Sequence, residues 1–338
     1  PRCGGGHEGR GPCPIRVLHA LKPGNDHTEA GASATCPDPA RRTPGAEGNT
    51  DRQDPRRAAH EAGAGGGEGR QDRAHAAGGG GALNNGVIIY EGPSAIDGSP
   101  IVVIATGLRR QSQNEKTGDL LQVWILPRDT LPGEAIRTGR DGGVCGDCIH
   151  RANDDGRSCY VATKTINTVW RAYQRGSYPP LATYQGTIRP GIPGIRWGAY
   201  GDPAAIPYHA AIRFGAWATA RGVRSVTHRA PGYTQRWQTS PWLRGHAMAS
   251  VATVEAGEHA RSWGWRTFRV ALDETEGPGD GEIWCPATPD GGSSTSCDRC
   301  GLCDGSRGPA DRRKSIVAKA HGSGAAAFRR RRRLATVG

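Results

Sequence analysis

The feature that most constrains this chain is a long segment without any large apolar side chain. Residues 22–82 contain no Ile, Leu, Val, Met, Phe, Trp or Tyr. Such a segment cannot bury enough apolar surface to offset the conformational entropy lost on ordering it. We therefore expect residues 1–82 to be a disordered, low-complexity extension or a segment foreign to the natural protein. The only methionine is Met248, and we expect the natural start near Asn84 or Val87.

Sequence patterns typical of folded structure begin after this segment, where all aromatic residues lie. Residues 83–328 are long enough for a single α/β domain. After Tyr178, strand-like and helix-like segments alternate, which predicts a parallel sheet covered by helices. We expect this sheet to form an irregular or partial β/α barrel with two cysteine-rich, metal-binding loops. Residues 329–338 are expected to be a basic, flexible tail.

The expected elements follow from apolar periodicity and from helix-capping and turn residues. The predicted strands are 87–90, 101–105, 119–126, 195–200, 223–228, 246–252, 265–270 and 315–320. The predicted helices are 132–138, 165–174, 203–221, 234–244 and 254–263. In such folds, ligand-binding groups gather where strands end. The candidates at these ends are Asp202, His228, Arg229, Arg269, Cys285 and His321.

The chain has no sequence signal for a membrane or for secretion. It has no apolar run of about 18 residues, the length that a membrane-spanning helix needs, and its N-terminal residues lack the apolar core of a signal peptide. We therefore expect a cytoplasmic protein. In that reducing compartment, clustered cysteines indicate metal binding more often than disulfides.

One cysteine group lies in the predicted loop 285–305. Its members are Cys285, Cys297, Cys300 and Cys303. Three thiolates on one CxxCxxC loop with a fourth from a remote Cys–Pro pair are typical of a [4Fe–4S] cluster, in which each iron takes one thiolate. Structural zinc is the alternative, although zinc sites more often use two separated CxxC pairs. Unmetallated thiols are a third interpretation.

The other cysteine group lies in the predicted loop 142–160. Cys145, Cys148, His150 and Cys159 could form the Cys₃His tetrahedron of a structural zinc site. Alternatively, His150 is a loop histidine bonded to the backbone. Three cysteines would then leave an open coordination position, which redox or radical chemistry at iron requires. The CxxxCxxC loop of the classical radical enzymes is absent.

Polar residues near two predicted strands suggest a ligand pocket. The run RWGAYGDP places Arg196 and Tyr200 close to Asp202, a combination that would suit a flat polar ligand such as a nucleobase. The alternative is an aromatic strand edge followed by a capping aspartate. We take Asp202, His228 and Arg196 as candidate catalytic residues.

Two other segments could contact phosphate. Residues 113–118 (QNEKTG) offer a lysine and backbone amides to an anion, but the segment precedes its strand and lacks the GxxxxGK[ST] pattern of a P-loop, which favours a polar turn. The second segment is a polybasic run that could bind nucleic acid or a nucleotide. It consists of Arg329, Arg330, Arg331, Arg332 and Arg333.

The ordered motifs CGDCIHR, VWRAYQRGSYP, GDPAAIP, GWRTFRV and CDRCGLC resemble a family of uncharacterised phage and prophage proteins. The resemblance covers residues 114–322. It marks the seven cysteines of both groups as signature residues, together with Arg196, Gly201, Asp202 and His321. It implies a phage or mobile-element setting and brings no established activity.

Together these features favour a metal-binding phage-type protein with an iron–sulfur cluster at the 285–305 loop and a second metal, zinc, at the 142–160 loop. The expected activity is that of a redox or radical-type enzyme acting on a nucleotide-like substrate. The alternative is a non-enzymatic accessory protein, stapled by zinc, that binds nucleic acid.

Overall fold

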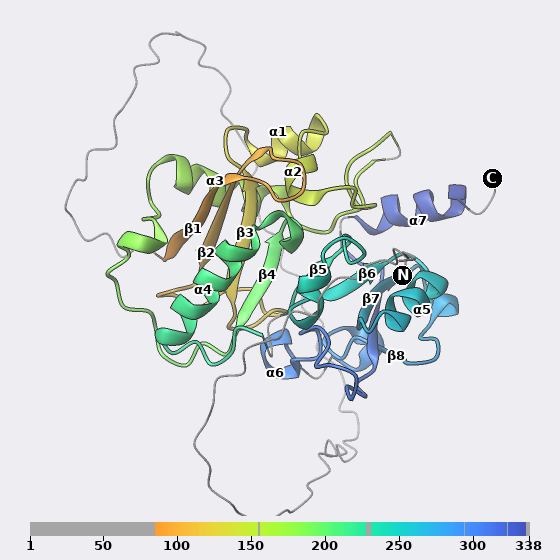
Figure 1. Ribbon diagram of the computed structural model, residues 1–338. Helices are drawn as coiled ribbons and strands as arrows, with labels where there is room; N and C mark the ends of the chain where they lie inside the picture. The colour runs from red at the N-terminus through yellow and green to blue at the C-terminus, as the bar shows by residue number, and fades with distance from the viewer. Residues whose placement is uncertain (1–84, 155, 228–230, 294, 323, 336–338) are drawn as a thin grey trace, which may run out of the picture. The chain divides into compact units, whose positions relative to one another are not determined.

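The computed structural model describes residues 85–154, 156–227, 231–293, 295–322 and 324–335 (Figure 1). For residues 333–335 it describes only the backbone. The predicted extension, residues 1–82, lies outside the described residues, so the expectation that it is disordered stays a prediction. The candidate catalytic residue His228 also lies outside them. The described residues belong to one compact unit, His75–Gly338.

The first sheet is mixed and has the strand order β1-β2-β3-β4. Its strands are β1 (Gly86–Pro93), β2 (Pro100–Thr106), β3 (Leu121–Pro127) and β4 (Ile195–Tyr200). The first three pair antiparallel, and β4 joins β3 in parallel. Every residue of β3 is buried, because helices cover the sheet: α1 (Pro132–Arg137) and α3 (Thr163–Gln174) pack on β3, and α4 (Tyr208–Ala220) packs on β1. The predicted elements of this region are confirmed, except the boundary of α4.

The second sheet is parallel and has the order β5-β6-β7-β9-β8. Its strands are β5 (Tyr233–Thr234), β6 (Met248–Val251), β7 (Thr267–Ala271), β8 (Glu282–Trp284) and β9 (Ser315–Lys319). Helix α5 (Val254–Ser262) connects β6 to β7 and packs on both. Its N-terminus is capped by Thr253, whose hydroxyl accepts a hydrogen bond from the backbone N–H of Ala256 at 3.2 Å.

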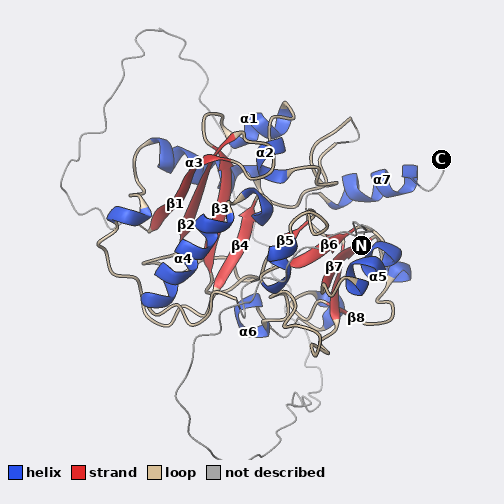
Figure 2. Ribbon diagram, in the orientation of Figure 1, coloured by secondary structure: helices blue, strands red, loops and turns tan. Residues whose placement is uncertain are grey.

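The α/β class is confirmed, but the described strands show no closed or partial barrel. They form two sheets, which Figure 2 shows beside one another. One isolated parallel bridge, Trp197 to Gly232, connects β4 to the residue before β5. Because β5 has only two residues, the ladder between the sheets stops after this bridge. The barrel was predicted from the alternation of strands and helices. That alternation predicts parallel pairing, but it does not show whether the outermost strands pair with each other to close a barrel.

Three predicted elements differ from the structure. The predicted helix 203–221 is interrupted, because Pro207 lacks a backbone N–H. Asp202 instead caps a single 3-10 turn, Pro203–Ala205, and α4 starts at Tyr208. The predicted helix 234–244 is irregular apart from the 3-10 turn Pro241–Gly245. The described part of the predicted strand 223–228 consists of bends and irregular loop.

Two short helices carry cysteines, and a longer one ends the described chain. The short helices are α2 (Gly142–Cys145) and α6 (Cys297–Cys300). Helix α7 (Ala325–Ala335) includes the arginine run that was expected to be part of a flexible tail. No helix among the described residues is long and apolar enough to cross a membrane.

Gly201 shapes the turn that follows β4, and its replacement is expected to destabilise the protein. Its φ of +87° lies in the left-handed region, and an added Cβ would come within 2.7 Å of the Ile125 side chain. We expect Gly201→Ala to lower the free energy of unfolding by more than about 1 kcal/mol. Urea unfolding would measure the change. Gly222→Ala is the matched control, because φ is +85° there and the added Cβ would meet open space; equal losses would contradict the role of the close contact.

Candidate functional site

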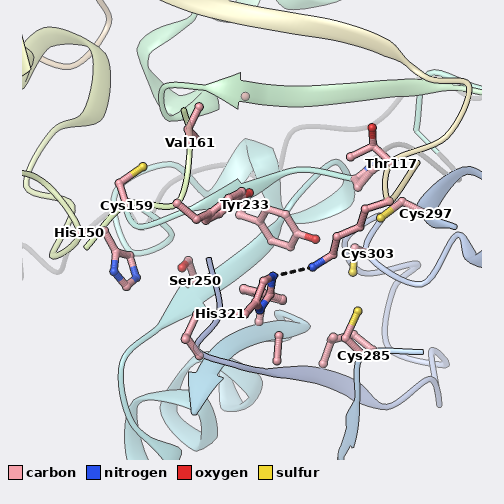
Figure 3. A pocket seen from close by; sticks show the side chains of 18 of the residues that line it. Thr117, His150, Cys159, Val161, Tyr233, Ser250, Cys285, Cys297, Cys303 and His321 are labelled. Carbon is pink, nitrogen blue, oxygen red and sulfur yellow. Dashed lines mark hydrogen bonds between the residues drawn. The ribbon is translucent and has the colours of Figure 1, made fainter. Parts of the chain in front are cut away.

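The seven cysteines of the two predicted loops line one cavity of about 340 Å³. Its walls come from β4, from the parallel sheet and from both cysteine loops. In Figure 3, Cys159 and His150 lie on one side, Cys285, Cys297 and Cys303 lie on the other, and Tyr233 and His321 lie between them. The sequence identified both groups, but nothing in their spacing indicated that they share a cavity.

The first group is held by the turn that follows α2. The backbone N–H of Cys148 donates to the Cys145 carbonyl at 3.2 Å, and that of Cys159 donates to the His150 carbonyl at 3.0 Å. Burial raises the pKa of the Cys145 thiol well above its usual value and that of Cys148 to about 12. Both thiols are therefore neutral near pH 7, and a bound metal would have to displace their protons.

His150 makes a side-chain contact that the sequence did not indicate. Its Nδ1 lies 3.0 Å from the Ser158 hydroxyl, and its ring packs against Phe328 of α7 with 5.6 Å between ring centroids. Burial, together with the charge of Arg331, lowers the pKa of His150 to about 4. The imidazole is therefore neutral, which is the form that a metal ligand requires.

The second group combines the end of β8 with α6. Cys285 follows β8, and its backbone N–H donates to the Val317 carbonyl at 2.7 Å. Cys297 and Cys300 lie on α6, and the turn after α6 brings Cys303 to the same cavity. Burial raises the pKa of Cys297 to about 11, Cys285 adds to the rise, and the cations Arg196 and Lys116 oppose it. Burial likewise raises the pKa of Cys303, and the other three thiols of the group contribute to that rise.

A buried ion network holds the turn that contains Cys303. The fully buried Asp304 carboxylate pairs with Arg307 at 2.8 Å and with Arg313. The buried Arg266 donates to the Leu302 carbonyl, directly before Cys303, and to the Gly305 carbonyl at 3.4 Å. These contacts fix the backbone on both sides of the cysteine.

The seven cysteines are free thiols. Among the described residues, no three His, Cys, Asp or Glu side chains are arranged to hold one metal ion. The two loops therefore supply the donors that a metal would need but not a finished coordination geometry. A metal bound by either group would require its thiols to turn towards a common centre.

The candidate catalytic residues Asp202 and Arg196 both line the cavity. The Asp202 carboxylate accepts hydrogen bonds from the backbone N–H groups of Ala204 at 2.9 Å and Gln235 at 2.8 Å. Burial raises the pKa of Asp202, and these hydrogen bonds offset only part of the rise. Because both of its oxygens are engaged, Asp202 joins β4 to the segment after β5.

Three arginines of α7 contact other parts of the protein. Arg331 donates to the Arg151 carbonyl at 3.0 Å, and Arg329 donates to the Ala320 carbonyl at 3.2 Å. Arg332 donates to the Ala252 carbonyl at 2.9 Å and pairs with Glu276 at 3.0 Å. These guanidinium groups hold α7 in place, and Phe328 of the same helix lines the cavity.

Comparisons with known proteins leave the chain without an assigned family. No family model, no curated protein and no solved structure matches it. A proposal about the function must therefore rest on the geometry of the cavity.

Proposed function

We propose that this protein is a metal-centre enzyme whose iron–sulfur cluster is held by Cys285, Cys297, Cys300 and Cys303 at the wall of a substrate cavity. The observation that carries the proposal is the shared cavity of about 340 Å³ that these four thiols line together with Arg196, Asp202 and Tyr233. A purely structural metal does not need to face a cavity that also presents an arginine, an aspartate and a tyrosine.

The donor set favours iron–sulfur over zinc. Three of the four thiols come from one short segment, α6 and the turn after it, and the fourth comes from the end of β8. A cubane cluster distributes four thiolates over four iron atoms, whereas zinc draws all four to one atom at about 2.3 Å. Such a cluster supplies one-electron transfer when it is bound.

The first group, Cys145, Cys148 and Cys159, is proposed to hold a second metal, zinc, together with His150. The ligands come from the turn after α2 and from the segment that ends at Cys159, so a metal would link these two segments. Neutral His150, with Nδ1 next to the Ser158 hydroxyl, has its Nε2 atom left for the metal.

The substrate is proposed to be a flat, polar, nucleotide-like molecule. Arg196 of β4, Tyr160 and Tyr233 offer a cation, hydroxyl groups and aromatic faces to the cavity. These groups suit a ring that carries hydrogen-bonding atoms. The alternative, a zinc-stapled protein that binds nucleic acid through Arg329–Arg333, has less support because several of these side chains bind the protein itself.

Metal analysis of the full chain, purified without oxygen, tests this proposal. We expect about four iron atoms with inorganic sulfide, and broad absorption near 400 nm, from a [4Fe–4S] cluster. Chelation of the iron should abolish this absorption. A colourless protein that contains only zinc would contradict the proposal and favour the nucleic-acid alternative, whose affinity should fall steeply with salt.

A further inference from the structure

Two cations and a histidine from distant parts of the chain meet in the cavity beside Cys297. Lys116 precedes β3, Arg196 lies on β4, and His321 follows β9, and all three line the cavity. The backbone carbonyl of Lys116 accepts a hydrogen bond from the Cys297 N–H at 2.9 Å, which fixes the lysine segment against α6.

The hydrogen bonds of His321 orient Lys116. Its Nδ1 lies 2.7 Å from the Lys319 carbonyl, which can only accept, so Nδ1 carries the proton. Its Nε2 lies 2.9 Å from the Lys116 ammonium and accepts from it, as the dashed line in Figure 3 marks. The ammonium keeps two further N–H groups for another partner.

Arg196 is half-buried and has unused donors. One terminal nitrogen donates to the Gln122 side-chain oxygen at 3.3 Å, and the other donates to the Tyr160 hydroxyl at 3.0 Å. A guanidinium has five N–H groups, and the other three make no hydrogen bond with the described residues. Within the described part of the chain, no carboxylate forms an ion pair with either Arg196 or Lys116.

Other charged groups of the cavity do not neutralise this pair. Asp202 is held by backbone N–H groups, as described above. Lys319 adds a third cation, which pairs with Glu274 and lies 3.5 Å from Asp290. Arg196 is half-buried without a counter-ion among the described residues, which is costly, and a guanidinium and an ammonium both match the oxygens of a carboxylate or phosphate.

We propose that Arg196, Lys116 and His321 form an oxyanion-binding site that holds a phosphate or carboxylate group of the substrate. Arg196 contributes N–H donors inside the cavity. Lys116, which His321 positions, contributes a positive charge at the more exposed end of the cavity. This inference rests on the proposed function in one respect: the anionic group is taken to belong to the substrate that the cavity binds. Anion binding itself does not require the metal.

Titration of the full chain with inorganic phosphate, and separately with acetate, tests the site at constant ionic strength. We expect saturable binding of one anion per chain. The anion that binds more tightly, phosphate or acetate, identifies the anionic group of the substrate as a phosphate or a carboxylate. Because charge-assisted hydrogen bonds contribute about 1.5–3 kcal/mol, Arg196→Gln should weaken binding about tenfold or more. Lys116→Gln, at the exposed end, should weaken it several-fold.

Matched controls use exposed residues outside the cavity. Arg175→Gln and Lys164→Gln remove the same charges from α3 and its C-cap and should leave anion binding unchanged. Absence of binding by the wild-type chain, or equal binding by the wild type and the Lys116→Gln variant, would overturn the site. Lys116→Gln keeps this test valid if Arg196→Gln does not fold.

Iron content measured on the same samples separates this inference from the proposed function. We expect Arg196→Gln to retain its iron while it loses the anion. If the wild type binds phosphate through these residues but contains no iron, the oxyanion site stands and the metal centre fails. If Arg196→Gln loses iron and the wild type binds neither anion, the cations serve the thiolates and the oxyanion site is wrong.

Discussion

Replacing Cys300 with serine should remove the iron from this protein while most of the fold remains. A serine hydroxyl is close to a thiol in size but is a poor ligand for iron, and each iron of the proposed cluster depends on one thiolate. We expect iron to fall from about four atoms per chain to less than one. Iron and sulfide assays with a visible spectrum would measure this loss.

The fold should survive because the larger hydrophobic core lies elsewhere. That core is formed by β1–β4 with the helices that cover them and includes Ile104, Ile125 and Phe214, all fully buried. Circular dichroism of Cys300→Ser should therefore resemble that of the wild type. Unfolding of the whole unit would instead indicate a metal that supplies folding energy, as structural zinc does.

Cys159→Ser is the matched control for this experiment. It removes a thiol from the other group, on the opposite side of the same cavity in Figure 3. We expect this variant to keep its iron and to lose only the second metal. Equal loss of iron from the two variants would contradict the assignment of the cluster to the second group.

Glu282→Gln should destabilise the parallel sheet strongly. Glu282 on β8 pairs with Arg269 on β7 at 2.8 Å, and the side chains are 0% and 2% exposed. The same carboxylate accepts from the Gly279 N–H at 3.0 Å. Removing one charge of a buried pair leaves the other uncompensated, so we expect a loss of about 3–5 kcal/mol in the free energy of unfolding. Urea denaturation would measure it.

Two further variants distinguish this effect from a general loss of charge. Glu258→Gln changes an exposed carboxylate on α5 and should alter stability by no more than about 0.5 kcal/mol. The double variant Arg269→Met with Glu282→Leu removes both charges and should recover most of the loss. Equal destabilisation by the single and double variants would show that the packing, rather than the unpaired charge, determines the cost.

The local elements of this fold were largely predictable. Residues 121–127 are apolar except for Gln122 and form a buried strand, and the apolar spacing of 165–174 predicted α3. These patterns work because strand and helix periods place apolar side chains on one face within a few residues. Prediction failed at 203–221 and 234–244, where prolines and short 3-10 turns interrupt otherwise helical spacing.

The sequence by itself determined which residues could form the site. Two cysteine groups stood out because ligand spacing along one loop is a local property. Arg196 and Asp202 were recognised in one short run that contains a predicted strand and the turn after it. Lys116 was considered as a possible phosphate contact, but the sequence favoured a polar turn at that position. Tyr233, which lies between the two thiol groups, was not predicted as a site residue.

Only the tertiary structure decided that these residues share one cavity. Lys116 and His321 form a hydrogen bond across 205 positions of sequence, and α7 brings Phe328 to His150 across a similar separation. Such contacts depend on the order in which strands enter the sheets, and the order β7-β9-β8 places a later strand between two earlier ones. Local periodicity carries no information about that order, because it specifies which face of a strand is apolar but not which strand lies next to it.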